Sequence, residues 1–422
     1  MELYDFLVYA LAFIGFFATS YYAISLFTYY KKKPLDREST ERNVSIIIPA
    51  YNEEKSIART INSALQLDYP KNKLEIIVVD DGSKDKTYEI ARRFMLKKYS
   101  KVLVFTKPNG GKGSALNLGI KHASGDIIVS MDADSFVQTD ALKKMIAFFD
   151  NPKVMAVTPS MGVFKPRGIL QRIQHIEYYM GVFLRKSFAT MNAIHITPGA
   201  FSAYRKSFFK KHGGYDEKNI TEDLEIALRI QHKHYIIENS PKSVVYTIAP
   251  RTFRALMVQR RRWYIGLIHN LWQYRNLFGF KRGPLGALVL PVAVSTIVLA
   301  VIVTIYLVIR TLFDVRDDLL SLQAINFRFN DAFELNFYLI KQFFYQLFSS
   351  PVFLIGFVFV FLLAFYMYFS RKQMKYSEGI AFDFIFFVTL YGFLYSFWWI
   401  VSFLYYLFKR KVVWREEKHG RH

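Results

Sequence analysis

The chain has 422 residues, of which 52% are hydrophobic and 18% aromatic. A chain this long and this apolar is not an ordinary soluble protein with one core, so we expect one part in a membrane and one part globular. The formal charge of +22 invites a nucleic-acid function, but much of the excess lies beside apolar segments, which argues against one. The absence of cysteine excludes disulfide frameworks and thiolate metal sites.

The first apolar segment runs from Phe6 to Tyr30 without a charge and is followed by Lys31, Lys32 and Lys33. It is long enough to cross a bilayer, which takes about 20 helical residues. A cleaved secretory signal is the alternative, but the segment exceeds a signal's apolar core and has no basic residue before it. We therefore expect a transmembrane helix over residues 1–33. The lysines after it predict a cytoplasmic central domain and an N-terminus outside.

Residues 40–250 are predicted to form an α/β domain of Rossmann type. Short β-branched strands alternate with helical segments, and the strands are apolar on both sides, which indicates a mainly parallel sheet covered on both faces. The expected strands are "VSIIIP" from Val44, "EIIVVD" from Glu75, "VLVF" from Val102 and "DIIVSM" from Asp126. The expected helices are 54–67, 86–98 and 113–123.

Acidic and polar residues follow three of these strands. Tyr51 and Glu53 come after the first strand, Asp80 and Asp81 after the second, and Asp132 and Asp134 after the fourth. Turn chemistry alone could explain any one of these loops. In a parallel sheet, however, all three meet at one edge, where ligands bind, and the mutual repulsion of the acids requires a compensating cation. Carboxylate oxygens favour Mg²⁺ or Mn²⁺, which also bind substrate phosphates.

A glycine-rich loop, "NGGKGSALNLG" from Asn109 to Gly119, begins the third of these helices. It lacks the Ser or Thr after the lysine that a Walker motif needs, and it does not follow the first strand. Its backbone N–H groups and Lys112 could still bind a diphosphate at the helix start.

Glu222 and Asp223 are predicted to lie in the first turn of a helix. Acidic residues are favoured there by the helix dipole alone, so a capping role and a catalytic role both stay open for Asp223. The segment 251–283 follows and is basic and amphipathic, which is typical of a helix at the membrane interface. It contains Gln259-Arg260-Arg261-Arg262-Trp263.

Residues 284–422 are expected to form the C-terminal membrane region, with about three spans. The apolar segments are Leu285 to Ile309, Val352 to Ser370 and Phe384 to Phe408. Three spans would place the basic tail from Lys409 outside, against the usual charge rule. Either a further span lies around Phe333 to Ser349, or the rule fails at this end. Trp398 and Trp399 could line a sugar path, although aromatic belts at the interface are commoner.

Several motifs, in order and spacing, resemble those of membrane-embedded family-two glycosyltransferases, most of all the processive enzymes that make cellulose, hyaluronan, chitin oligomers and poly-N-acetylglucosamine. The motifs are "IIIPAYNEE", "VVDDGSKDKT", "GGKGSALNLG", "DADS", "ITEDLEIALR" and "QRRRW". The resemblance covers about Val44 to Trp263 and implies a nucleotide-diphospho-sugar transferase domain of GT-A type, inserted between transmembrane helices.

The resemblance also implies roles for individual residues. Tyr51, Asp80 and Asp81 match positions that line a uridine pocket, while Asp132 and Asp134 match the pair that holds the metal and the sugar-nucleotide diphosphate. Asp223 matches the general base, Arg262 a contact to diphosphate and Trp263 an aromatic platform for the acceptor sugar. We also assign Glu53 and Lys112 to the nucleotide sugar and Glu222 to the acceptor.

The leading hypothesis is an inverting transferase that uses a UDP-sugar and requires Mn²⁺ or Mg²⁺. The first choice of donor is UDP-N-acetylglucosamine, and the second is UDP-glucose. It would extend a β-linked polysaccharide processively and export it, with self-association or an export partner to complete the channel. Transfer of a single sugar to a polyprenyl phosphate in the membrane is the nearest alternative. A non-catalytic membrane scaffold would have damaged motifs, yet none of the acids is missing. A nucleic-acid partner is not expected.

Overall fold

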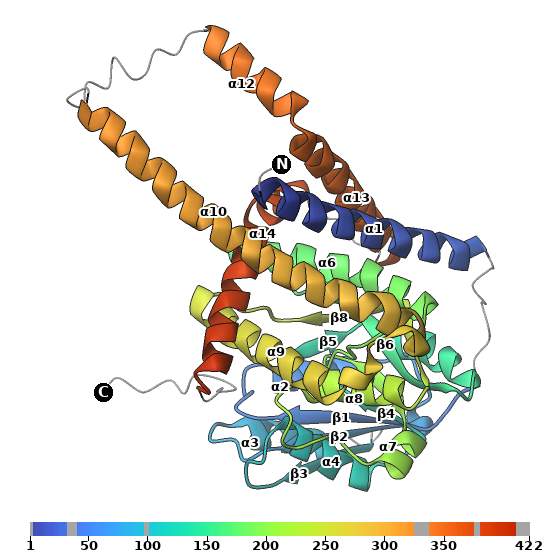
Figure 1. Cartoon of the computed structure of the whole chain (residues 1–422). Helices are drawn as coiled ribbons and strands as arrows, with labels where there is room; N and C mark the ends of the chain where they lie inside the picture. Colours follow the sequence, from blue (N-terminus) through green and yellow to red (C-terminus); the bar gives the residue numbers. More distant parts are fainter. Residues whose placement is uncertain (1–2, 32–39, 97–100, 325–336, 375–379, 411–422) are drawn as a thin grey trace, which may run out of the picture.

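The computed structural model describes residues 3–31, 40–96, 101–324, 337–374 and 380–410. Of the basic residues that flank the apolar segments, Lys32, Lys33, Lys375 and Lys411 lie outside these ranges. Figure 1 shows an α/β sheet domain on one side of the molecule and the long apolar helices gathered on the other. The chain therefore has the two parts that its composition predicts.

The α/β domain contains an eight-stranded sheet in the order β3-β2-β1-β4-β7-β6-β8-β5. β1, β2, β3 and β4 are parallel, as predicted, whereas β7 runs antiparallel to β4 and β5 antiparallel to β8. The strands are β1 (Val44–Ala50), β2 (Leu74–Asp80), β3 (Lys101–Thr106), β4 (Ile127–Ser130), β5 (Ser135–Val137), β6 (Val154–Val163), β7 (Ser202–Arg205) and β8 (Ile236–Thr247).

Helices cover both faces of this sheet. Side chains alternate along β1, so Ile46 and Ile48 enter the core under one layer of helices, while Ile47 belongs with Leu116 to the core on the opposite face. The expected helix 54–67 begins later, at Ile57, after a turn in which the amide of Ser56 donates to the carbonyl of Glu53. The helices are α2 (Ile57–Leu65), α3 (Thr87–Arg92), α4 (Lys112–His122), α5 (Ala141–Ile146), α6 (Gly168–Thr190), α7 (Lys206–His212), α8 (Glu222–His232) and α9 (Phe253–Gln273).

The apolar part contains α1 (Leu3–Lys31), α10 (Leu290–Ala324), α12 (Phe337–Ser349), α13 (Pro351–Met374) and α14 (Ala381–Leu407). Within the described residues, four helical segments are long and apolar enough to cross a membrane: Phe6–Thr28, Leu285–Ala324, Phe353–Met374 and Ala381–Leu407. They coincide with the four segments expected from the sequence. α12 has 13 residues and is too short for a further span. Residues 333–336, where such a span was considered, lie outside the described ranges.

α6 and α9 lie between the sheet and the apolar helices (Figure 1). The ring of Phe183 in α6 stacks on Tyr366 of α13 at 3.6 Å, and the hydroxyl of Ser370 donates to the carbonyl of Tyr179 at 2.7 Å. On α9, the ring of Tyr264 stacks on Trp399 of α14 at 4.2 Å. The sheet domain is thus packed directly onto the apolar helices, and α9 occupies most of the segment 251–283 that was expected at the membrane interface.

Candidate active site

The three polar loops meet at one edge of the sheet. β1 lies between β2 and β4, with Ala50 opposite Asp80 and Ile47 opposite Ser130. Because these strands are parallel, the segments that follow them leave the sheet at the same edge. This edge is where open α/β sheets bind ligands.

The loops after β1 and β2 are tied to each other by hydrogen bonds. The amide of Asn52 donates to the Ser83 hydroxyl at 2.9 Å, and the amide of Lys84 donates to the Asn52 side chain at 2.8 Å. The amide of Glu53 donates to the Thr87 hydroxyl at 2.7 Å. Tyr51, which precedes Asn52, is therefore held beside the loop that carries Asp80 and Asp81.

Asp80 and Asp81 have different surroundings, although they are neighbours and both buried. Asp81 accepts hydrogen bonds from Lys107 at 2.7 Å and from the amides of Gly110 and Gly111 at 3.0 and 2.8 Å. Asp80 accepts from the Thr106 hydroxyl at 3.0 Å through Oδ2, whereas its buried Oδ1 has no hydrogen-bond partner within the described residues. A buried oxygen without a donor is a place where a ligand N–H can bind.

The glycine-rich loop therefore differs from its expected role in one respect. The backbone N–H groups of the loop were expected as possible donors to a diphosphate, and in the structure two of them, those of Gly110 and Gly111, donate to Asp81. The loop also approaches Gly82 so closely that a Cβ there would lie 2.9 Å from the amide nitrogen of Asn109, and Gly82 has a φ of +75°. Glycine is the residue that permits both features.

Asp132 and Asp134 lie on the turn between β4 and β5. The carbonyl of Ala133 between them accepts a hydrogen bond from Thr60 of α2 at 2.8 Å, which fixes the turn. The Asp132 side chain is 32% exposed, and Asp134 lies near Tyr178 of α6. Burial, together with the charges of Glu177 and Asp134, raises the pKa of Tyr178 to about 12.

Lys112 connects this turn to the start of α8. Its Nζ lies 2.7 Å from Asp132 Oδ1 and 2.8 Å from Glu222 Oε1. Burial alone would lower the pKa of Lys112, but the surrounding carboxylates, Asp132 and Glu222 foremost, raise it above its ordinary value. Gly199 covers this ion pair, and a Cβ at Gly199 would lie 2.3 Å from Nζ.

This arrangement corrects one step of the sequence argument. The repulsion among the acids was taken to require an external cation. In the structure two lysines supply part of that compensation, Lys107 to Asp81 and Lys112 to Asp132. Their contribution could not be read from motif spacing, because each lysine is contributed by a different loop from its partner.

Asp223 lies in the first turn of α8, next to the Lys112 ion pairs. Burial and the neighbouring Glu222 raise its pKa to about 6, and the cations Lys112 and Arg262 oppose this increase. Its Oδ1 accepts a hydrogen bond from the amide of Leu224 at 2.9 Å, while the N-cap residue Thr221 makes no side-chain capping bond. A carboxylate with a pKa near neutrality can accept a proton during a reaction.

α9 brings Arg262 toward Asp223 by docking closely onto α8. A Cβ on Gly266 would lie 2.3 Å from the Thr221 hydroxyl, so only glycine allows this approach. The buried side chain of Asn270 donates to Thr221 at 2.9 Å and to Asn219 at 3.2 Å. Gly266 and Asn270 are site residues that the sequence argument missed. A glycine inside a helical pattern was the available signal for Gly266.

The site fits a hard divalent cation. Within the part of the chain that the structure describes, no group of three or more His, Cys, Asp or Glu side chains could hold a metal ion, so the chain could supply at most two such ligands here, Asp132 and Asp134. Mg²⁺ is commonly bound by one or two carboxylates together with substrate phosphates, and carboxylates also suit Mn²⁺. The partly exposed Asp132 carboxylate leaves room for such shared binding.

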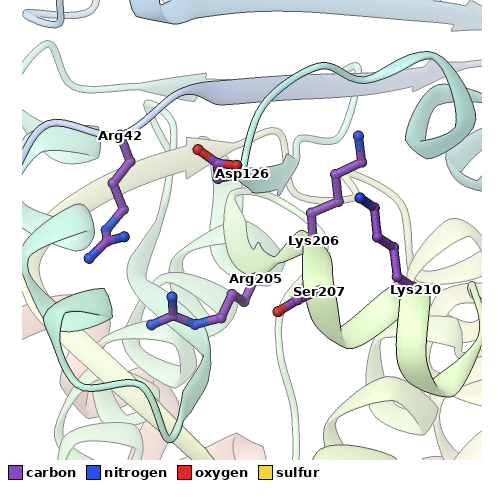
Figure 2. Close-up of a pocket in the computed structure, with 6 residues that line it drawn as sticks. All are labelled: Arg42, Asp126, Arg205, Lys206, Ser207 and Lys210. Atoms are coloured by element: carbon purple, nitrogen blue, oxygen red, sulfur yellow. The ribbon is translucent and has the colours of Figure 1, made fainter.

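A basic pocket of about 290 Å³ lies elsewhere, at the edge where β1 and β4 begin (Figure 2). Its cations already stabilise the fold: Arg205 donates to the carbonyls of Phe149 and Val154, and Arg42 pairs with Asp150 at 3.2 Å. The pocket is therefore separate from the acidic site. Its lining residues are Arg42, Asp126, Arg205, Lys206, Ser207 and Lys210.

The sheet topology defines a GT-A-like domain flanked by long apolar helices, and these helices mark the chain as a multi-pass membrane protein. The model of the family described as "Glycosyl transferase family 2" matches residues 45–213. The chain belongs to this family.

Two curated relatives and one solved structure show the extent of the similarity. The chain is 32% identical over 287 residues to the poly-beta-1,6-N-acetyl-D-glucosamine synthase of Staphylococcus epidermidis, which covers 64% of this chain and 68% of that protein. It is 34% identical over 247 residues to the probable glycosyltransferase YdaM of Bacillus subtilis, covering 56% and 58%. The mannosyltransferase PcManGT from Pyrobaculum calidifontis, solved in complex with GDP-Man and Mn²⁺, has a TM-score of 0.61 at 21% identity and covers 97% of this chain and 100% of its own. The likeness to PcManGT shows a shared fold.

Proposed function

We propose that this protein transfers a sugar from a UDP-sugar to a growing β-linked polysaccharide, with inversion at the anomeric carbon. UDP-N-acetylglucosamine is the first candidate for the donor. The observation that supports this most is Asp223, a carboxylate whose pKa is raised to about 6 beside the cations Lys112 and Arg262. The name of the S. epidermidis relative supports the choice of sugar.

The proposed donor site uses the sheet edge. Tyr51 and Asp80 would bind the uridine, Asp80 through the buried Oδ1 that has no partner among the described residues. Asp81 would hold the glycine-rich loop, and Glu53 would hold the loop after β1. Asp132 and Asp134 would hold Mn²⁺ or Mg²⁺, which would neutralise charge on the diphosphate. Lys112 and Arg262 would add positive charge where the leaving group departs.

The proposed chemistry has a direct displacement as its central step. Asp223 would take the proton of the acceptor hydroxyl as the hydroxyl oxygen bonds to the anomeric carbon and the bond to the diphosphate breaks. Direct attack inverts the configuration, so an α-linked donor yields a β-linked product. Trp263, with Glu222 near Lys112, would position the acceptor, since an aromatic face packs well against a sugar ring.

The proposed placement in the cell follows from the basic flanks of the spans. Lys31 at the C-terminal end of α1, and Lys281 and Arg282 before α10, would keep the sheet domain in the cytoplasm. The acceptor side would then face the membrane helices, consistent with polymer export through them and with membrane lipids around α1, α10, α13 and α14. Self-association or an export partner would complete a channel. Nucleic acid is not a proposed partner.

Transfer of a single sugar to a polyprenyl phosphate is the second candidate. It is favoured by the packing of Trp398 and Trp399, which are 0% and 6% exposed and contact α9. From the sequence, these indoles were considered as the lining of a sugar path. In the structure they are packed against α9 and do not line an open path for a polymer.

One experiment separates the candidates. Membranes that contain the protein are incubated with radiolabelled UDP-N-acetylglucosamine and Mn²⁺, and the product is sized after lipid extraction and nuclease treatment. Long, nuclease-resistant product supports the polymerase, and a single labelled sugar in the lipid phase supports the second candidate. UDP binding without any turnover would contradict both and support a scaffold.

A further inference from the structure

A buried ion pair joins α6 to α9 beside the proposed acceptor site. Arg260 of α9 donates to both carboxylate oxygens of Glu177 of α6, at 2.6 and 2.5 Å. The Arg260 side chain is 2% exposed and that of Glu177 is 19% exposed. A guanidinium buried this far needs a carboxylate partner, so Glu177 determines where Arg260 can lie.

The same guanidinium lies over two indole rings. Its central carbon is 4.6 Å from the ring of Trp263 and 5.1 Å from the ring of Trp398 in α14. Arg260 and Trp263 are three residues apart on α9 and therefore share one face of the helix. A cation over an indole face is attracted to it, more strongly where water is excluded, so the position of Arg260 also fixes that of Trp263.

The donor side of α9 is anchored independently of this pair. Gly266 and Asn270 hold α9 against Thr221 at the start of α8. Arg262 influences Asp223, whereas Arg260 pairs with Glu177. Loss of Glu177 would therefore release the Trp263 platform while the contacts around Asp223 persist.

We infer that Glu177 and Arg260 are positioning residues that hold Trp263, and with it the acceptor sugar, in register with Asp223 and against α14. The inference rests on the proposed function, in which Trp263 binds the acceptor. Neither side chain touches the reacting atoms in this account. Their effect is on geometry, and misplacement of a reacting group by about 1 Å can lower a rate on the order of 100-fold.

The test uses the full-length protein in lipid nanodiscs and the variant Glu177→Gln. UDP-N-acetylglucosamine, Mn²⁺ and a β-1,6-linked N-acetylglucosamine oligosaccharide are supplied, and both UDP release and sugar incorporation are measured. We expect incorporation to fall on the order of 100-fold, while UDP affinity by calorimetry stays unchanged and UDP release by hydrolysis persists. The fraction of released UDP matched by incorporated sugar therefore decreases. Glu177→Asp, which keeps the charge, should restore part of that fraction.

Two further variants keep the test decisive. If Glu177→Gln does not fold, the double variant Glu177→Met/Arg260→Met removes both buried charges together and should fold, since apolar replacement of a whole buried pair is often tolerated. It should show the same loss of incorporation. Glu75→Gln is the matched control, because Glu75 is a buried carboxylate that pairs with Lys101 at 2.5 Å, near the edge of the sheet where β2 begins. It should lower stability and leave the fraction unchanged.

The outcomes separate this inference from the proposed function. No sugar transfer by the wild-type protein would refute the proposed function. Suppose that the wild type transfers sugar normally and that Glu177→Gln matches the same fraction of released UDP with incorporated sugar as the wild type does. This result would refute the inference alone. An equal loss of UDP affinity and incorporation in Glu177→Gln would show a merely structural pair and would also overturn it.

Discussion

The substitution Asp223→Asn distinguishes a catalytic carboxylate from a helix-capping one through its effect on stability. Asp223 has a pKa of about 6 in the folded protein against an ordinary value of 3.8. A pKa that is higher by about two in the folded protein means that ionisation of Asp223 lowers the free energy of unfolding by about 3 kcal/mol. Because the folded pKa is the higher one, this cost is absent below about pH 4, grows as the pH rises and is complete above about pH 6.

Asp223→Asn should therefore stabilise the protein by up to about 3 kcal/mol at pH 7, and the gain should vanish at about pH 4. The asparagine Oδ1 can still accept the hydrogen bond from the Leu224 amide, which is 2.9 Å long in the wild type. Turnover should nevertheless fall by about 100-fold or more, since the general base is lost.

The assay combines thermal unfolding in one detergent at both pH values with UDP calorimetry and turnover of labelled UDP-N-acetylglucosamine. The control on the same helix is Glu225→Gln, which breaks a buried pair with Arg229 at 2.5 Å and should lower stability at pH 7. If Asp223→Asn were destabilised like the control, or kept its turnover, Asp223 would be a structural residue and the argument would be refuted.

Three further predictions concern pH, metal and helix packing. The wild-type kcat/KM should rise with pH through about 6 and then level off, because Asp223 must be deprotonated to act as a base; a flat profile over about pH 5 to 7 would contradict this. Asp134→Asn should raise the Mn²⁺ concentration needed for UDP binding about tenfold or more in calorimetry, and an unchanged metal titration would remove Asp134 from the site. Gly266→Ala would place a Cβ 2.3 Å from the Thr221 hydroxyl and should therefore separate α9 from α8. It should lower stability by about 1–3 kcal/mol and reduce turnover. An unchanged melting temperature would show that the contact is not tight.

The fold and the site edge were predictable because their signals are local. Apolar runs such as those of β1 and β2 predict buried parallel strands, and the acids directly after them must then share an edge. Asp223 was placed correctly in the first turn of a helix for the same reason, since α8 begins at Glu222.

The electrostatic network was not predictable, because its members are distant in sequence. Lys112 pairs with Glu222, and Arg260 pairs with Glu177, only after the sheet and α6 have placed them together. The separate roles of Asp80 and Asp81 also depend on where the chain returns, since Gly110 and Gly111 reach Asp81 from another loop. The prediction stopped at β4 and missed β5 to β8. β5 and β7 have only three and four residues, and strands this short give little periodicity.

A density map of the full-length protein in nanodiscs with UDP-N-acetylglucosamine and Mn²⁺ would locate the metal ion and the nucleotide. The account predicts a Mn²⁺ ion bound by the carboxylates of Asp132 and Asp134 and by the diphosphate, with Lys112 and Arg262 beside the leaving group and Asp223 facing the anomeric carbon. A nucleotide bound elsewhere, for example in the basic pocket of Arg42 and Lys210, or an ion remote from Asp132 and Asp134, would contradict it.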